Sequence, residues 1–248
     1  MTELSIVIPV KNEAENIGPL ISGIAEACDG KTYEIIVVDD GSTDDTADIV
    51  NGLRAEDARI RLVRHGRSGG QSAAIHSGTL AARGPIVCTL DGDGQNPPEE
   101  LPKLYGPLMH DTTGRLGLVA GQRVGRKDTV SKKWASRFAN GLRARVLHDG
   151  TRDTGCGLKG FRREAFLGLP YFDHMHRYMP ALFRRDGWDV LLVDVSHRER
   201  QAGQSKYTNF HRALVGIPDL LAVAWLIRRR KKVQVMAPAG DNEGSGND

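Results

Sequence analysis

Short apolar runs alternate with amphipathic segments over the first hundred residues of the chain. The runs are rich in Val and Ile, which is typical of buried strands, and the segments between them have the apolar spacing of helices. The strand starts lie about 25 to 30 residues apart, so the pattern predicts βαβ units and a mostly parallel sheet. We expect Pro9 to end the pairing of the first strand, because proline cannot donate to a ladder. Strands are expected at 4–10, 33–38, 59–63 and 85–90, and helices at 13–27, 43–55, 71–82 and from 97 onward.

The second half of the chain carries a weaker pattern. Strands are expected at 116–121 and 188–195 and helices at 163–169 and 174–185, while 155–161 is either a strand or a loop. We expect one α/β domain over 1–206, ending in a polar, flexible loop. A C-terminal amphipathic helix with a polybasic end is expected at 207–232. Its apolar residues 217–227 and the cations 228–232 predict contact with the inner face of the cell membrane, and a core helix ended by cations that suit its dipole is the alternative. The tail, 233–248, is of low complexity and is expected to be disordered.

Charge changes this picture locally rather than globally. The chain has 248 residues, 40% of them hydrophobic, which suits one substantial core, and its net charge of +3 does not suggest a nucleic-acid partner. Between Arg123 and Arg145, however, eight Lys or Arg stand against one acid, Asp128. Such a block attracts phosphates, and a solvated helix face is the alternative.

The cysteines and the first residues predict the compartment. The three cysteines are widely spaced and odd in number, so they form neither a zinc pattern nor a disulfide framework, and a reducing cytoplasm is expected. The first strand begins so early that we expect no signal peptide. No stretch approaches the roughly 20 apolar residues that a spanning helix needs. We therefore expect a cytoplasmic protein.

Polar and acidic side chains follow three of the predicted strands. Asn12-Glu13, Asp39-Asp40 and the pair Asp91/Asp93 stand at strand ends, which share one edge of a parallel sheet. Carboxylates suit a divalent cation that keeps open positions for nucleotide phosphates, and glycines beside them allow close backbone approach. An isolated Asp-Gly-Asp-Gly could be a solvated turn, but polar residues at the ends of three strands that share one edge indicate a site.

These motifs resemble the family-2 glycosyltransferases of the GT-A fold. The resemblance rests on Ile8-Pro9-Val10-Lys11-Asn12-Glu13, on 37–44 and on Asp91-Gly92-Asp93-Gly94-Gln95-Asn96-Pro97. More narrowly, 154–162 and 200–206 are similar to the dolichol-phosphate mannosyltransferase type and its bacterial polyprenyl-phosphate relatives. The resemblance covers roughly 4–210, so it implies that 1–206 is a GT-A catalytic domain.

The resemblance also implies an activity. It is the inverting transfer of a sugar from a UDP- or GDP-sugar donor to a polyprenyl or dolichyl phosphate, with Mg²⁺ or Mn²⁺. A phosphate acceptor is already largely ionised at pH 7, since its second pKa is about 6, so it needs no strong base. Cations would then neutralise the departing diphosphate.

The matching positions imply the roles of individual residues. Asp40 would read the base, while Asp39 either contacts the donor or forms the turn, and Gln71 either faces the donor or caps a helix. Metal ligands are expected at Asp91, Asp93 and Gln95. Nucleotide-sugar contacts are expected at Pro9, Asn12, Glu13, Asp40, Gln71, Asp91 and Arg123.

The acceptor side is implied by later positions. Arg137, Ser131, Arg200 and Lys206 would bind the acceptor phosphate, and Arg200 and Lys206 would also act in catalysis with Asp93. If the reaction needs a base, Asp153 is the carboxylate that would serve. In the alternative, Asp153 only caps the loop and has no catalytic role. His174 and His176 are expected to be packing or surface residues.

Other functions compete with this interpretation. A family-2 transferase that acts on a saccharide acceptor would usually need a base, so the role of Asp153 discriminates the two. The segment 90–94 also resembles the nucleophile motif of haloacid-dehalogenase-type phosphatases, although there the acidic pair opens the fold. A Rossmann oxidoreductase would need Gly-x-Gly-x-x-Gly after the first strand, where this chain has Lys-Asn-Glu-Ala. A non-catalytic sensor would need a damaged metal pair, and here the pair is intact.

Overall fold

The protein is built on a seven-stranded sheet. The computed structural model describes residues 1–124, 146–147, 149–198 and 209–230. The strand order is β3-β2-β1-β4-β6-β5-β7. β6 runs antiparallel to both of its neighbours and the other pairs are parallel, which confirms the predicted mostly parallel sheet. The strands are β1 (Leu4–Val10), β2 (Tyr33–Asp39), β3 (Ile60–Arg64), β4 (Ile86–Thr89), β5 (Leu116–Arg123), β6 (Lys159–Arg162) and β7 (Asp189–Val195).

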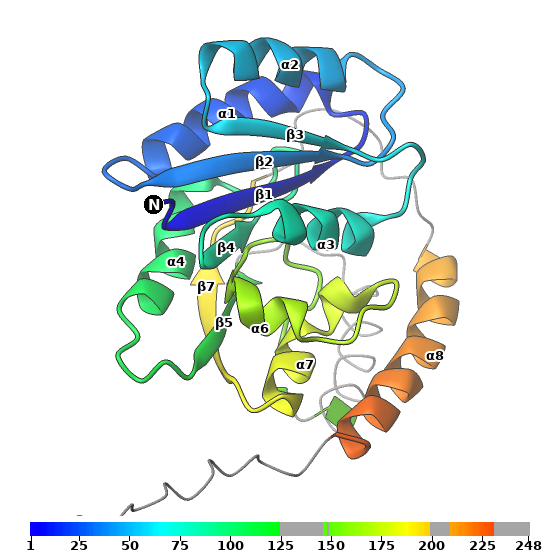
Figure 1. Ribbon diagram of the computed structural model, residues 1–248. Helices are drawn as coiled ribbons and strands as arrows, with labels where there is room; N and C mark the ends of the chain where they lie inside the picture. Colours follow the sequence, from blue (N-terminus) through cyan, green and yellow to red (C-terminus); the bar gives the residue numbers. More distant parts are fainter. Residues whose placement is uncertain (125–145, 148, 199–208, 231–248) are drawn as a thin grey trace, which may run out of the picture.

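Helices cover both faces of the sheet (Figure 1). Because side chains alternate along a strand, Ile6 and Ile8 of β1 pack in one hydrophobic core and Val7 packs in the other. The first core includes α1 (Ala14–Ala27), α2 (Thr46–Glu56) and α4 (Leu101–Met109), and the second includes α3 (Gln71–Ala81), α6 (Arg163–Leu167) and α7 (Met179–Arg185). Burial on both faces explains why the strands are almost continuously apolar.

The strand directions bring distant parts of the sequence to one edge. β1, β2, β4, β5 and β7 point the same way, so Val10, Asp39, Thr89, Arg123 and Val195 all end at this edge. The antiparallel β6 begins there, at Lys159, which pairs with Thr89 and Ala120. We call this the site edge.

Two local predictions differ from the structure. β1 is a central strand, and Pro9 lies inside it, paired in register with Val38 of β2. On the other side of β1, the pairing with β4 ends at Val7, so Pro9 lies beyond that ladder. The helix expected at 174–185 is divided into the 3₁₀ turn η2 (Met175–Arg177) and α7, after His174 with a left-handed φ of 63°. The undecided segment 155–161 ends in β6.

The last described element is α8 (Asn209–Arg228), which lies against α7 (Figure 1). Val223 is buried in the second core, and Arg185 Nε donates to the carbonyl of Leu226 at 3.0 Å. Over the part of the chain that the structure describes, no helix is both long and apolar enough to cross a membrane. The division at 206 and the disordered tail stay predictions, and 233–248 lie outside the described residues.

Candidate active site

Asp91 lies at the site edge, held between α3 and the loop that precedes β6. It follows β4, and its Oδ1 accepts a hydrogen bond of 2.6 Å from Nε2 of Gln71, the first residue of α3. Gly157 packs directly against it, because a Cβ at Gly157 would stand 2.3 Å from Asp91 Oδ2. Thr89 Oγ1 donates to the carbonyl of Gly157 at 2.8 Å and fixes this approach. Only glycine fits at 157 while Asp91 holds this position.

Asp93 and Gln95 form a turn beyond Asp91. The backbone N–H of Gln95 donates to Asp93 Oδ1 at 3.1 Å, and Gly94 between them has a φ of 72° that suits glycine. Gly92 lies close to β1, since a Cβ there would be 2.6 Å from Val10 Cγ1. The loop therefore folds over the end of the central strand, where sequence analysis placed it.

The charges of this loop suit a divalent cation. Burial raises the pKa of Asp91 above its ordinary value, and the negative charge of Asp93 raises it further. A bound cation would relieve both effects, and carboxylate and amide oxygens are the ligands that Mg²⁺ and Mn²⁺ take. No group of three or more His, Cys, Asp or Glu gathers as a metal centre among the described residues. Two carboxylates and the Gln95 amide would leave positions open for phosphate oxygens.

The Asp40 carboxylate binds the start of α3. His65 Nδ1 lies 2.7 Å from Oδ1, to which the backbone N–H of Gly69 also donates, and Oδ2 accepts from Ser68 Oγ and the N–H of Gly70. Burial opposes ionisation, but these hydrogen bonds outweigh it and hold the pKa of Asp40 below its usual value. All four acceptor positions of the carboxylate are used inside the protein. Its contact with a base stays a prediction.

Asp39 forms the turn after β2. Its buried Oδ1 accepts from the backbone N–H of Ser42 at 2.8 Å, and Oδ2 accepts from Nε of Arg64 at 3.2 Å. Arg64 ends β3 at the same edge. The turn-forming alternative for Asp39 is therefore the one that the structure contains.

Asn12 and Glu13 join the β1 and β2 loops. Asn12 has a left-handed φ of 57°, its Oδ1 accepts from the N–H of Thr43, and its own N–H donates to Ser42 Oγ. The N–H of Glu13 donates to Thr46 Oγ1 at 2.9 Å. Pro9 lies at the same place, its carbonyl oxygen 3.2 Å from where a Cβ of Gly92 would stand. The polar residues after β1, β2 and β4 therefore lie at one edge of the sheet, as predicted.

Arg123 and Asp153 form a bidentate ion pair. Arg123 Nε and Nη2 lie 2.5 and 2.9 Å from the two carboxylate oxygens, and both side chains are largely buried. Burial disfavours the charged form of Asp153, but the hydrogen bond and charge of Arg123 overcome it and lower its pKa. A carboxylate held in this way is a poor proton acceptor near pH 7. Gln122 Oε1 accepts from the N–H of Asp153 at 3.0 Å and fixes the loop to β5.

Sequence reasoning missed Lys159 as a site residue. This lysine is buried at the start of β6, and its Nζ donates to the carbonyl of Cys156. Burial lowers its pKa, while Cys156, Asp91 and Asp153 act in the opposite direction. Lys159 lies within the 154–162 stretch that carries the narrower family resemblance, but nothing in the sequence marked it for a role of its own.

Four predicted phosphate-binding residues lie outside the described part of the chain: Ser131, Arg137, Arg200 and Lys206. His174 and His176 behave as expected for packing residues, since His174 pairs with Asp219 at 3.4 Å and His176 Nδ1 lies 2.8 Å from Ser72 Oγ.

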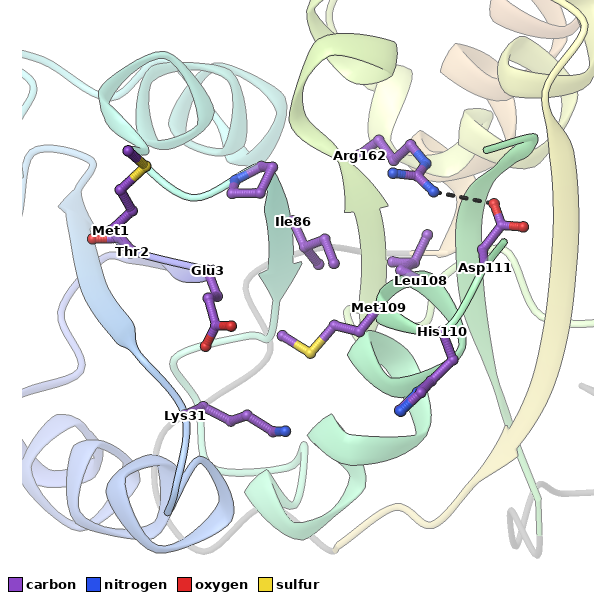
Figure 2. A pocket seen from close by; sticks show the side chains of 11 residues that line it. Met1, Thr2, Glu3, Lys31, Ile86, Leu108, Met109, His110, Asp111 and Arg162 are labelled. Atoms are coloured by element: carbon purple, nitrogen blue, oxygen red, sulfur yellow. Dashed lines mark hydrogen bonds and ion pairs between the residues drawn. The ribbon is translucent and has the colours of Figure 1, made fainter. Parts of the chain in front are cut away.

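Hollows in the described part of the chain include one at each edge of the sheet. A hollow of about 560 Å³ opens at the opposite edge of the sheet, beside Ile86 at the start of β4 and the Asp111–Arg162 ion pair (Figure 2). None of the predicted site residues lines it. A groove of about 430 Å³ runs along α1 and is lined on its other side by Gly94, Pro98, Glu99 and Arg198.

Comparison with known proteins gives a consistent family. The model described as "Glycosyl transferase family 2" matches residues 5–168. The undecaprenyl-phosphate 4-deoxy-4-formamido-L-arabinose transferase of Edwardsiella ictaluri is 35% identical over 82% of this chain and 62% of its own length. The dodecaprenyl-phosphate galacturonate synthase of Rhizobium johnstonii is 35% identical over 93% of this chain and 69% of its own length. The chain thus spans less than two thirds of the length of the first of these relatives.

Solved structures agree with the fold. Glucosyl-3-phosphoglycerate synthase from Mycobacterium tuberculosis, in complex with UDP, superposes with a TM-score of 0.65 at 26% identity over 90% of this chain and 80% of that one. Its complex with Mg²⁺ and UDP gives 0.64 at 25% identity over 92% and 79%. The predicted GT-A fold is thereby confirmed.

Proposed function

We propose a sugar-transfer function from one premise: the chain belongs to glycosyl transferase family 2, whose model matches residues 5–168. The reaction proposed is inverting transfer of a sugar from a UDP- or GDP-sugar to a polyprenyl phosphate. The observation that carries it is the convergence of Asp91, Asp93 and Gln95 at the site edge, in a chain 35% identical to two polyprenyl-phosphate sugar transferases. The family assignment leaves the dehalogenase interpretation without support.

On the donor side, Asp91, Asp93 and Gln95 would hold Mg²⁺ or Mn²⁺, and Gln71 orients Asp91 for that role. The metal supplies positive charge for the diphosphate of the donor. A glucosyl-3-phosphoglycerate synthase of similar fold has been solved with Mn²⁺ and UDP-glucose, at 25% identity. Pro9, Asn12 and Glu13 lie at or just beyond the end of β1, and Arg123 ends β5 at the same edge of the sheet. We infer that these four residues contact the nucleotide-sugar.

On the acceptor side, a phosphate oxygen would attack the anomeric carbon of the sugar. The bond from that carbon to the diphosphate breaks, and its electron pair leaves with the nucleoside diphosphate. Arg200 and Lys206, with Arg137 and Ser131, would bind the acceptor phosphate and balance the charge that develops. No proton has to be removed from a phosphate that is already ionised.

The Arg123–Asp153 pair favours a phosphate acceptor over a saccharide hydroxyl. A hydroxyl nucleophile needs a base, and Asp153 is the carboxylate nominated for that role. Its two oxygens are engaged by Arg123, which lowers its pKa and its basicity. We therefore assign Asp153 a positioning role, in which it holds Arg123 toward the donor.

We further propose that α8 rests on the inner face of the cell membrane. Ile217, Leu221 and Trp225 recur every four residues along the helix and are 61%, 65% and 59% exposed. The adjoining Arg228, Arg229 and Arg230 are exposed, and the sequence continues with Lys231-Lys232. An apolar stripe beside a cluster of cations fits an anionic lipid surface, where Trp is favoured at the headgroup level.

The test is a transfer assay with a panel of UDP- and GDP-sugars, with Mg²⁺ or Mn²⁺, and with vesicles that contain polyprenyl phosphate. We expect label to move into the lipid fraction only with a divalent ion and the correct donor. Transfer to a soluble saccharide but not to the lipid would replace the acceptor in this proposal. Absence of transfer from every donor to both acceptors would reject it.

A further inference from the structure

Asn96 belongs to the acidic motif after β4, yet neither the metal nor the donor has been assigned to it above. Its side chain is only 2% exposed, and its Nδ2 is buried without a hydrogen-bond partner among the residues that the structure describes. Buried amide groups are nearly always hydrogen-bonded, because the bonds that they lose to water have to be replaced. A buried donor without a partner in the loop of a candidate active site indicates a partner that becomes available when the site is loaded.

The backbone on both sides of Asn96 is fixed. The carbonyl of Gln95 accepts a hydrogen bond of 3.0 Å from the N–H of Arg198, and the carbonyl of Pro97 accepts one of 3.1 Å from the N–H of Glu100. Proline at 97 also disfavours a helical backbone at Asn96. The amide of Asn96 is therefore held where it is, and it cannot turn toward a different part of the protein without breaking this loop.

Asp91 is the neighbour that can accept from this amide. Burial and the negative charge of Asp93 raise the pKa of Asp91, whereas the charge of Lys159 and the amide of Asn96 act to lower it. Only a donor favours the ionised carboxylate, so Nδ2 rather than Oδ1 of Asn96 faces Asp91. The contact nevertheless falls short of a complete hydrogen bond in this structure. Gln71, by contrast, already donates to Asp91 Oδ1 at 2.6 Å.

An ordinary structural role does not account for this amide. Asparagine in a loop usually bonds the neighbouring backbone or a nearby side chain. Asn16 at the start of α1 is an example, since its Nδ2 donates to Glu13 Oε2 at 2.7 Å. The Nδ2 of Asn96 has no such bond within the described ranges, so its burial opposes folding and is not compensated there.

We propose that Asn96 is a positioning residue that donates its side-chain amide to Asp91 when Asp91 and Asp93 hold the metal and the donor diphosphate. The inference rests on the sugar-transfer function proposed above. Asn96 touches neither metal nor substrate in this scheme, because its Nδ2 is closed to solvent. Together with Gln71 it would fix the orientation of one carboxylate, and partners that orient a metal ligand in this way typically change metal affinity about 10- to 100-fold.

The first test replaces the amide by an apolar side chain of similar size. In chelator, Asn96→Leu should unfold at a urea concentration no lower than that of the parent, because an unpaired donor is removed and no hydrogen bond is lost. Its affinity for UDP in Mn²⁺ should fall about tenfold or more. Asn51→Leu, at an exposed position of α2, is the control and should change neither quantity.

Two results with Asn96→Leu would overturn the inference. A variant that unfolds more easily than the parent in chelator would show that the amide already stabilises the metal-free protein. An affinity for UDP in Mn²⁺ equal to that of the parent would show that Asp91 needs no second donor.

Nuclear magnetic resonance adds a readout on the parent protein, which does not depend on how a variant folds. The side-chain NH₂ signals of Asn96 can be assigned by their absence from the spectrum of Asn96→Leu. We expect one of them to move downfield when Mg²⁺ and UDP are added, and its exchange with solvent to slow severalfold, because its proton becomes hydrogen-bonded. The NH₂ signals of Asn51 should not respond.

This readout separates the inference from the proposed function. If the parent binds UDP in Mg²⁺ while the Asn96 signals stay unchanged, the inference is wrong and the proposed function stands. If the parent binds no UDP but Mg²⁺ alone moves the Asn96 signals, the proposed function fails and the contact between Asn96 and Asp91 stands. Signals that respond to neither addition would overturn the inference whatever the activity.

Discussion

The side-chain amide of Gln71 donates a hydrogen bond of 2.6 Å to the carboxylate of Asp91, and so joins the start of α3 to the end of β4. The residues just before Gln71, Gly69 and Gly70, bind Asp40 at the end of β2 through their backbone N–H groups. The ends of β2 and β4 are therefore both joined to the start of α3. A side chain that sequence analysis left between two roles orients the proposed metal ligand.

The first prediction concerns this contact. Gln71→Ala removes the side chain of α3 that donates a hydrogen bond to Asp91, so the carboxylate should lose its fixed orientation. We expect metal-dependent UDP binding to weaken roughly tenfold, as for the loss of one hydrogen bond to a charged group. Calorimetric titration with UDP and Mn²⁺ measures this directly. Asn51→Ala, on the surface of α2, is the control, and equal affinities for the two variants would contradict the prediction.

The second prediction concerns Gly157. Gly157→Ala places a methyl group where Asp91 Oδ2 now lies, so Asp91 or β6 must move. Overpacking of this kind costs about 1–3 kcal/mol, and here it also displaces a proposed metal ligand. We expect a lower unfolding free energy together with a loss of transfer greater than tenfold. Gly168→Ala is the control, because no atom would lie closer than 3.6 Å to its Cβ. A fully active Gly157→Ala enzyme would show that Asp91 is not held there in solution.

The sequence was enough to predict that the polar residues after β1, β2 and β4 lie at one edge of the sheet. It was not enough to predict which side chains bind them. Parallel topology forces Asn12, Asp39 and Asp91 to one edge, whatever the loops do. Once the strands were recognised, the location of the site followed. The antiparallel β6 was the exception, since four residues containing Lys, Gly and Arg do not carry a strand pattern.

The pairing of charges depends instead on loops that meet only in three dimensions. Arg123 and Asp153 are separated by 29 residues and are brought together because Gln122 holds the 152–153 backbone. No spacing in the sequence marks them as partners. The hydrogen bonds that occupy both carboxylate oxygens of Asp40 likewise require the 65–70 loop to fold back over the end of β2. A motif match cannot reveal this.

The third prediction concerns Asp40 and pH. Asp40→Asn turns one acceptor oxygen into a donor that faces other donors, which should cost about 2 kcal/mol of unfolding free energy at pH 7. The folded-state pKa of Asp40 lies below its ordinary value of about 3.9, so its ionised form adds stability above about pH 4 and loses it as pH falls through the folded pKa. The gap between parent and variant in urea unfolding should therefore shrink below pH 4. An exposed carboxylate, Asp45, supplies the control as Asp45→Asn. A gap that is constant with pH would disprove the role of the charge.

The fourth prediction concerns the metal. Asp93→Asn keeps the shape of the side chain and removes one negative charge, so UDP binding in Mn²⁺ should weaken and transfer should nearly vanish. The parent should likewise lose transfer in excess chelator and regain it when Mg²⁺ or Mn²⁺ is restored. Both results follow because the diphosphate of the donor needs a counter-charge in order to leave. Full activity in chelator, for the parent or the variant, would be incompatible with a metal at this loop.

The last prediction concerns the exposed stripe of α8. A Leu221→Glu/Trp225→Glu variant puts two charges where apolar side chains are now 65% and 59% exposed, and it leaves the buried Val223 in place. We expect the parent to float with anionic liposomes at low salt and to be released in part at high salt, because each nearby cation contributes about 1 kcal/mol and is screened. The variant should stay unbound with an unchanged melting temperature. Leu80→Glu, at a residue 54% exposed on α3, should float like the parent and so controls for the loss of any exposed leucine. Flotation of the double variant would assign binding to the cations alone, and a parent that never floats would remove α8 from the membrane.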